Sequence, residues 1–395
     1  MTGNIGLHPP NPNLTMANWA ELHPDLLQVI AKRLISSEAF PALTAFGGVC
    51  TSWRSAWTAL KEHHQRMPPQ DVWLMLAEEE EEEEEDEDED REEKCGFFSL
   101  SKGNNRYLQL PETMGKQCFS FPEGWVITAA ENFEMNLLQP ITHVQIKLPR
   151  WNTLYRASYL EFPCIILKAG LSANPSRTSD FTVFIVYGTG ILAYAKPGDN
   201  AWTILRKGLR YFVEAAFYKN KIHGVDVKGR IWVCNNIGDS ESESMATMVF
   251  RPRIFGKGYS WIDKAYLVES SGKLLVVFRS GVQRHRTHSF QVYELNLSEK
   301  SAVQVKDLGD NALFLGNNTS VCVNASKVHG CEGNCIYFTD DCLHQYFCDG
   351  CMGLRTGGKD MGVCDLRDGS IKQHFIGESL SNICPPFWVF PNFFP

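Results

Sequence analysis

Four cysteines near the C-terminal end have a spacing that could bind a metal ion. Cys331, Cys335, Cys348 and Cys351 form a C-x3-C, twelve-residue, C-x2-C series. Thiolates on two close turns are what tetrahedral zinc requires. Alternatively, Cys335 begins the strand-like CIYFTDD and is simply a small buried hydrophobe. We favour this second interpretation and expect no metal or cofactor, and metal analysis of the purified protein would test it.

Two other patterns resemble catalytic or cofactor-binding motifs. Gly188, Gly190 and Ala193 match the dinucleotide fingerprint G-x-G-x-x-A after a strand-like run, but Pro197-Gly198 stops any helix within about two turns. This segment is therefore predicted to be a strand, a glycine turn and a second strand. The paired acids Asp340 and Asp341 would point to opposite faces of a strand, so they cannot easily share one site.

We assign no catalytic residue, because P-loop, H-E-x-x-H and G-x-S-x-G patterns are absent. The basic cluster Arg284, His285, Arg286 and His288 is interpreted as a solvated hairpin tip, with contact to an acidic partner as the alternative. The tryptophans are assigned to packing, although a minority could line a central ligand mouth; they are Trp202, Trp232, Trp261 and Trp388.

Composition limits the classes of protein to consider. The chain has 395 residues, is 44% hydrophobic and has a net charge of -8. Residues 78–93 hold 15 acids and one arginine, so the remainder is mildly basic at +6. Neither part has the charge density of a nucleic-acid binder, and no segment predicts a membrane span or a secretory signal. Thirteen cysteines without a framework pattern fit a reducing compartment, so we expect the nucleus, the cytoplasm or both.

Four zones follow from the pattern along the chain. Residues 1–17 are a Pro/Asn/Gly-rich tail, 18–66 are helical, 67–94 form an acidic linker around the 78–93 run, and 95–395 are all-β. In the helical zone, Leu26, Leu27, Ile30 and Leu34 are predicted on one face of a helix that begins near Pro24 and Asp25. Two further helices are expected, at Glu38 to Phe46 and along the stripe Val49, Trp53, Trp57 and Leu60. So small a unit cannot form a large core, so we expect it to pack against a partner.

The all-β zone contains a loosely repeated unit of a strand, a glycine turn and an aromatic-rich strand. The examples span residues 221–235, 266–279 and 328–341, with turn glycines Gly229, Gly272 and Gly333. Propeller blades recur at roughly 40 to 50 residues. At that period we predict a β-propeller-like domain of six or seven blades, with a pair of β-sandwiches as the alternative.

Residues 19–57 read WAELHPDLLQVIAKRLISSEAFPALTAFGGVCTSWRSAW and closely resemble the F-box. One departure is His23, where the family usually has the proline of its Leu-Pro pair. The resemblance implies docking onto the Skp-type adaptor of a cullin-RING ubiquitin ligase. The residues that it assigns to adaptor binding are Trp19, Leu22, Pro24, Leu26, Leu27, Ile30, Leu34, Val49, Cys50, Trp53 and Arg54.

Segments of the all-β zone, among them VKDLGDNALFLGNNTS (305–320) and ICPPFWVFP (383–391), look like the kelch-like C-terminal domain of a large plant F-box family. The two resemblances together imply an α+β multidomain chain, in which a three-helix F-box precedes an all-β, β-propeller-like domain. The implied function is a non-catalytic substrate receptor of a Skp-cullin-F-box ligase with an unknown protein client. The alternatives are an enzyme or small-molecule-binding protein built on the β-domain, and an adaptor-binding protein outside a ligase.

Overall fold

The chain divides into two compact units, residues 1–67 and 68–393, in a computed structural model. The structure describes residues 19–36, 45–62, 71–76, 95–108, 110–157, 166–205, 211–235, 237, 244–252, 262, 264–281, 286–341, 358–373 and 384–390. Within these residues, no helix combines the length and the apolar character needed to cross a membrane.

The described part of the N-terminal unit contains two α-helices, a 3-10 turn and residues 45–50, of which 45 and 46 are helical. The 3-10 turn is η1 (Trp19–Glu21), and the helices are α1 (Pro24–Ser36) and α3 (Thr51–Glu62). Pro24 and Asp25 occupy the first turn of α1, as expected, and the backbone N–H of Asp25 donates to Nδ1 of His23 at 3.4 Å. His23 thus accepts a backbone hydrogen bond at the start of the helix, as capping side chains do. Most of the expected helix at Glu38 to Phe46 lies outside the described residues.

The helical stripe predicted from the sequence is only partly on the core side. Leu27 is fully buried with Ala31, Phe46 and Ala56, while Leu22, Ile30, Leu34, Trp53 and Trp57 pack against them at partial burial. Leu26, expected on the same face, is 53% exposed instead. Residues 26 and 27 are 100° apart around a helix, so both cannot face a narrow core.

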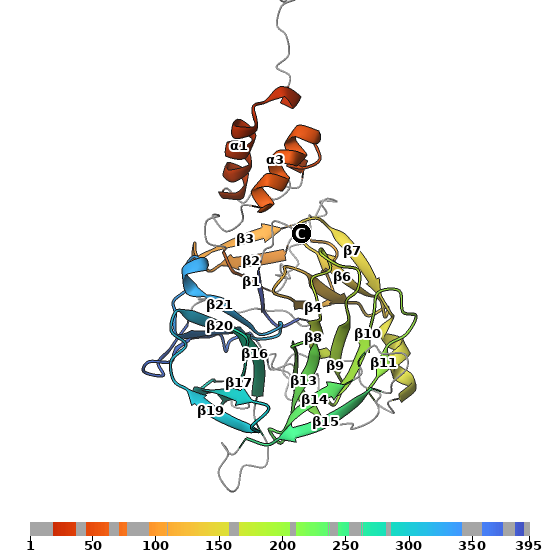
Figure 1. Cartoon of the computed structure of the whole chain (residues 1–395), viewed down its shortest axis with the longest axis vertical. Helices are drawn as coiled ribbons and strands as arrows, with labels where there is room; N and C mark the ends of the chain where they lie inside the picture. The colour runs from red at the N-terminus through yellow and green to blue at the C-terminus, as the bar shows by residue number, and fades with distance from the viewer. Residues whose placement is uncertain are drawn as a thin grey trace, which may run out of the picture. The chain divides into compact units, whose positions relative to one another are not determined.

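The described residues of the second unit form six sheets, in which neighbouring strands are antiparallel except for the parallel pair β20 and β22 (Figure 1). Five of the sheets are built from strands that are consecutive in the chain, and the sixth also takes a strand from the C-terminal end. We number them as blades. Blade 2 holds β4 (Gln117–Ser120), β5 (Val126–Ala129), β6 (Met135–Gln139) and β7 (Val144–Leu148). Blade 3 holds β8 (Ile166–Leu171), β9 (Val183–Tyr187), β10 (Ile191–Ala195) and β11 (Thr203–Ile204), and follows the 3-10 helix η3 (Trp151–Ala157). Blade 4 holds β12 (Phe212–Tyr218), β13 (Lys221–Asp226), β14 (Ile231–Asn235) and β15 (Met245–Phe250).

Blade 5 holds β16 (Lys264–Ser270), β17 (Lys273–Ser280), β18 (Ser289–Asn296) and β19 (Ser301–Val305). Blade 6 has five strands: β20 (Asn311–Leu315), β21 (Val321–Asn324), β22 (Cys335–Phe338), β23 (Gly362–Asp365) and β24 (Ile371–Lys372), with the 3-10 turn η5 (Ala325–Lys327) after β21. Six sheets in a ring confirm the propeller expectation at six blades and exclude the pair of sandwiches.

The ring is closed by a strand from the C-terminal end. β25 (Phe387–Val389) pairs with β1 (Trp73–Met75), and β1 pairs with β2 (Cys95–Ser99), which pairs with β3 (Asn104–Leu108) to complete blade 1. The first and last strands of the propeller therefore share one sheet, which removes the open edge of an unclosed ring.

This pairing corrects the domain boundary predicted from the sequence. The β-domain was expected to begin at Cys95, after an acidic linker, but β1 precedes the acidic run and belongs to blade 1. Residues 77–94 accordingly connect two neighbouring strands of one sheet and do not separate two domains. A three-residue strand such as Trp73–Met75 is too short to show an alternating pattern, so it could not be predicted from the sequence.

The repeated unit holds for two of its three examples. Residues 221–235 form the β13–β14 hairpin and residues 266–279 lie in the β16–β17 hairpin, both antiparallel. Gly229 and Gly272 have positive φ angles of 69° and 78° at the two turns. The third example is different, because β22 pairs with β20 in parallel and not with a strand directly before it.

The apolar core lies between neighbouring blades. One buried cluster joins blades 2 and 3, another joins blades 3 and 4, and the others join blades 4 and 5, 5 and 6, and 6 and 1. Inner and middle strands are thus covered on both faces, and Val183–Tyr187 is buried along its whole length. Continuous apolar runs, and not alternating ones, are the pattern expected of such strands.

Candidate functional site

The helical unit is held together around Phe46. Its ring centroid lies 4.6 Å from that of Trp53 and 6.3 Å from that of Trp57. Nε1 of Trp53 donates to the carbonyl oxygen of Trp19 at 2.9 Å, which ties η1 to α3. Nε of Arg54 donates to the carbonyl oxygen of Gly47 at 3.3 Å.

Large apolar side chains of this unit remain exposed. Trp19 is 63% exposed, Leu26 53%, Val29 52% and Val49 54%. Leu26 and Val29 are three residues apart in α1 and so lie on one side of the helix. Exposed apolar side chains concentrated in so small a unit mark a surface that a partner can cover.

The residues that the sequence assigned to adaptor binding divide by burial. Exposed are Trp19, Pro24, Leu26, Val49 and Arg54; half-buried are Leu22, Ile30, Leu34, Cys50 and Trp53; and Leu27 is fully buried. Leu27 has no exposed surface and packs in the core of the unit, so its assigned role in adaptor binding stays a prediction, as do the other assignments. Val29, which the sequence did not single out, is exposed beside Leu26 because it lies outside the core stripe of an amphipathic helix.

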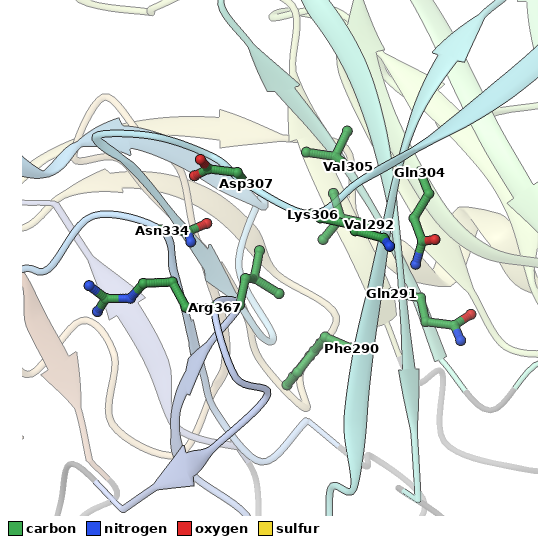
Figure 2. Close-up of a pocket in the computed structure, with 10 residues that line it drawn as sticks. Phe290, Gln291, Val292, Gln304, Val305, Lys306, Asp307, Asn334 and Arg367 are labelled. Carbon is green, nitrogen blue, oxygen red and sulfur yellow. The ribbon is translucent and has the colours of Figure 1, made fainter.

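The propeller carries a pocket of about 400 Å³ between blades 5 and 6. Its apolar part comes from Phe290, Val292, Val305 and Leu366, and its polar groups come from Gln291, Gln304, Lys306, Asp307, Asn334 and Arg367 (Figure 2). Several polar groups are held in place. Oδ1 of Asn334 accepts from the N–H of Leu308 at 2.8 Å, and the Arg367 guanidinium is 2.6 Å from Oδ2 of Asp365. A pocket lined by both apolar side chains and fixed polar groups suits a side chain of a peptide segment.

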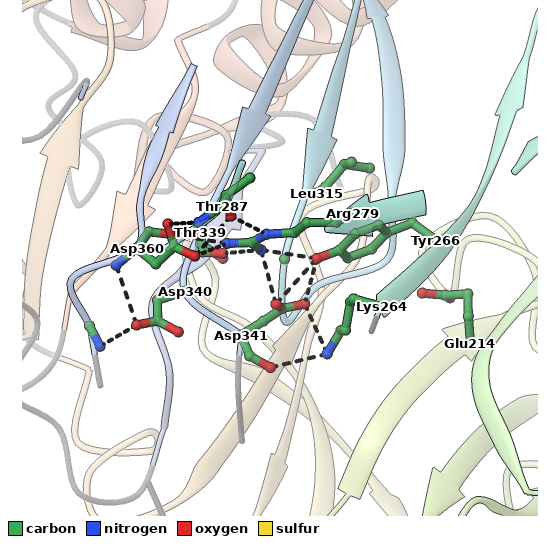
Figure 3. A network of polar contacts seen from close by, with 12 residues as sticks. Glu214, Lys264, Tyr266, Arg279, Thr287, Leu315, Thr339, Asp340, Asp341 and Asp360 are labelled. Atoms are coloured by element: carbon green, nitrogen blue, oxygen red, sulfur yellow. Dashed lines mark hydrogen bonds and ion pairs between the residues drawn. The ribbon is translucent and has the colours of Figure 1, made fainter. Parts of the chain in front are cut away.

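Buried charges of blade 5 meet acidic residues that follow β22 and precede β23 of blade 6 (Figure 3). The side chain of Arg279 is 0% exposed, and its guanidinium lies 3.1 Å from Oδ1 of Asp341 and 3.0 Å from Oδ2 of Asp360. Nζ of Lys264 lies 3.1 Å from Oδ2 of Asp341. Burial raises the pKa of the Asp341 carboxyl, but Lys264 and Arg279 outweigh it, so the pKa is lowered.

A second buried pair adjoins this network. Nζ of Lys168 in β8 lies 3.0 Å from Oε2 of Glu214 in β12, with side-chain exposures of 4% and 1%. Burial raises the pKa of Glu214 to about 7, although Lys168 acts in the opposite direction. Lys168 also donates to the carbonyl oxygen of Gly316 at 3.2 Å.

The segment from Gly316 to Ser320 bridges several blades. The N–H of Thr319 donates to the carbonyl oxygen of Ser120 at 3.0 Å, and its hydroxyl donates to that of Ala169 at 3.3 Å. Asn317 donates to the carbonyl oxygen of Cys118 at 3.5 Å. The segment between β20 and β21 of blade 6 is therefore tied by hydrogen bonds to β4 of blade 2 and β8 of blade 3.

The remaining motifs have structural roles where they are described. β9 and β10 form a tight antiparallel hairpin, which confirms the hairpin interpretation of the glycine motif. Gly190 has a φ of 98°, and a Cβ there would come within 2.5 Å of the Phe212 backbone. Asp340 accepts from the N–H groups of Gly358 and Lys359, whereas Asp341 pairs with Arg279, so the two acids do have separate partners.

Half of the cysteine series lies outside the described residues, namely Cys348 and Cys351, as do Arg284, His285 and Trp261. In the ranges given above, no three His, Cys, Asp or Glu side chains are grouped so that they could hold a metal ion. Burial raises the pKa of Cys331 to about 12. Trp202, Trp232 and Trp388 are buried, as the packing assignment predicted.

Six blades closed by a C-terminal strand define a β-propeller protein, here preceded by a helical unit with exposed apolar side chains. The chain belongs to the KIB1-4 beta-propeller family, whose model matches residues 97–365. A kelch-like domain is not confirmed by this match.

Similar proteins come from Arabidopsis thaliana. "F-box protein SKIP23" is 25% identical to this chain, with 95% of both chains covered. "Putative F-box protein At1g65770" is 26% identical, with 84% of this chain and 92% of the relative covered. Among solved structures, the Swd1 β-propeller domain of Myceliophteria thermophila aligns with a TM-score of 0.35 and 11% identity, over 71% of this chain and 80% of that one.

Proposed function

We propose that this chain is the substrate-recognition subunit of a Skp-cullin-F-box ubiquitin ligase, with its helical unit docking on the Skp-type adaptor and its propeller binding a protein client. The observation that carries the proposal is the group of exposed apolar side chains in the helical unit, Trp19, Leu26, Val29 and Val49. The relatives named F-box proteins support the same role, since they align over most of their length.

In this role the chain performs no covalent chemistry. It holds the client beside the ubiquitin-loaded enzyme and so raises the client's effective concentration there. The pocket between blades 5 and 6 is our candidate for client contact, because it combines apolar surface from Phe290 and Leu366 with the amides of Gln291 and Gln304.

Binding of purified Skp-type adaptor to the full-length protein tests the proposal. The variant Leu26→Ala, Val49→Ala removes two exposed side chains that the core does not need, so the helical unit should stay folded. Interface anchors are each worth about 1 to 2 kcal/mol, so loss of two should lower affinity roughly 30- to 1,000-fold. The matched control is Val303→Ala, which truncates an equally exposed valine of the propeller (65% exposed) and should leave binding unchanged.

Two outcomes contradict the proposal. If the wild-type protein does not bind the adaptor while its helical unit is folded by circular dichroism, the docking role fails. If it binds the adaptor but cullin is never recovered in the complex, the chain is an adaptor-binding protein outside a ligase.

A further inference from the structure

Two thiols from distant parts of the sequence meet beside the strand that closes the propeller. Cys118 lies in β4 of blade 2, and Cys384 lies just before β25, 266 residues later. Sγ of Cys384 accepts from the N–H of Cys118 at 3.3 Å and donates to its carbonyl oxygen at 3.5 Å.

The two cysteines differ in their access to solvent. Cys384 is half-buried, whereas Cys118 is buried and its thiol faces the carbonyl oxygens of Thr113 and Lys116. The hydrogen bond from Cys384, together with burial, raises the pKa of Cys118. Because Cys384 is the more exposed of the two, a small oxidant would meet it first, and Cys118 lies beside it as a second thiol that could resolve the oxidised sulfur.

We propose that Cys118 and Cys384 form an oxidation site at which a peroxide converts the pair to a disulfide. The Cys384 sulfur attacks one peroxide oxygen; an S–O bond forms, the O–O bond breaks, and the thiol proton leaves with the released hydroxide as water. The Cys118 sulfur then attacks the sulfenic sulfur of Cys384; the S–S bond forms, the S–O bond breaks, and a second water carries away the Cys118 proton. Hydrogen peroxide is reduced to two waters, and the two thiols lose two electrons.

The disulfide would fix the closing segment of the ring covalently. β25 is held in blade 1 by its pairing with β1, and Cys384 precedes it by three residues. A link from Cys384 to β4 would join this segment to blade 2 as well. Because a crosslink between residues far apart in sequence restricts the unfolded chain, the oxidised protein should melt at a higher temperature.

The experiment uses reduced full-length protein treated with hydrogen peroxide, then alkylated, digested without reductant and mapped by mass spectrometry. We expect a crosslinked peptide that contains Cys118 and Cys384 and disappears with dithiothreitol, together with a melting temperature raised by a few degrees. The proposal is overturned if both cysteines are alkylated after treatment, if they are separately oxidised to sulfinic acid, or if either is linked to another cysteine.

Variants distinguish the order of the two steps. Cys118→Ala should leave Cys384 as a sulfenic acid that dimedone traps, and Cys384→Ser should leave Cys118 reduced; oxidation of Cys118 to the same extent in Cys384→Ser would refute this order. The control Cys234→Ala removes a buried cysteine of blade 4 and should keep the crosslink. Cys118 is buried, so Cys118→Ala could prevent folding. In that case the crosslink map of the wild-type protein and the variant Cys384→Ser, at a half-buried position, still test the proposal.

Discussion

Single residues inside the propeller carry charge that is balanced by neighbours. Arg279 meets Asp341 and Asp360, and Lys168 meets Glu214, all with little or no exposed side-chain surface. A buried ion pair adds little stability over an apolar equivalent, but loss of one partner leaves a charge without compensation. Substitutions at these positions should therefore have large effects, whereas substitutions in exposed pairs should not.

Replacement of Arg279 by methionine should destabilise the propeller by about 3 to 5 kcal/mol, because Asp341 and Asp360 would lose the guanidinium between them. Urea denaturation measures the change. The matched control is Arg367→Met, whose ion pair with Asp365 lies at the surface and is screened by solvent, so its loss should change stability much less. If the two variants lost the same unfolding free energy, the prediction that the buried ion pair matters more than the exposed one would be wrong.

Glu214 should make stability depend on pH near neutrality. Burial raises its pKa in the folded chain to about 7, above the unfolded value of 4.5. The folded state then binds more protons, so the contribution of this group is complete below pH 4.5 and is lost as the pH rises through about 7. Glu214→Gln should remove a decline in unfolding free energy on the order of 1 to 3 kcal/mol between pH 5 and 8.

Denaturation of wild type and Glu214→Gln at each pH checks this prediction. Burial lowers the pKa of His223, so that residue acts in the opposite direction over the same interval. The difference between the two proteins removes the contribution of His223. The change Glu294→Gln, at a half-exposed ion pair with Lys273, is the control, and the prediction fails if its difference curve has the same slope.

At the scale of elements, closure depends on β25, a strand of only three residues. Trp388 within it is fully buried, and its ring centroid lies 5.1 Å from that of Phe314 in blade 6. Its Nε1 donates to the carbonyl oxygen of Leu315 at 3.2 Å. One side chain thus joins the closing strand to the neighbouring blade.

Trp388→Ala should cost about 3 to 5 kcal/mol, since it leaves a cavity between blades 1 and 6. Thermal unfolding and limited proteolysis of the C-terminal segment measure the loss. Tyr211→Ala is the control, because Tyr211 is 60% exposed and its truncation should change little. A similar melting temperature for wild type and Trp388→Ala would show that β25 is not required for closure.

At the scale of the whole molecule, the acidic run lies within the part of the sequence that forms the propeller. Residues 77–94 join β1 to β2, so the run is an insertion within blade 1. Antiparallel neighbours need only a short turn between them. The insertion is therefore not needed to connect the two strands.

Replacement of residues 78–93 by four Gly/Ser residues should leave the melting temperature of the propeller nearly unchanged and adaptor binding within about twofold. The physical reason is that like charges in this run offer nothing apolar to bury. Calorimetry and the adaptor-binding assay check the two parts. Loss of adaptor binding would show that the run helps to fold or orient the helical unit.

Local patterns in the sequence determined much of this protein. The periodicity of Leu27, Ile30 and Leu34 indicated a helix, and the glycine turns at Gly229 and Gly272 indicated hairpins; both depend on neighbours within a few residues. The F-box resemblance also rests on a local pattern, and the adaptor-binding residues that it implies stay a prediction. Such local signals survive without knowledge of the tertiary fold.

Only the tertiary structure decided the features that join distant residues. Strand β1 belongs to the propeller because β25, more than 300 residues later, pairs with it. Packing likewise decides that Leu26 is exposed while Leu27 is buried. It also places Arg279 between Asp341 and Asp360, and Cys118 beside Cys384. Burial and long-range pairing depend on which surfaces meet in the folded chain, and those contacts cannot be deduced from local sequence patterns alone.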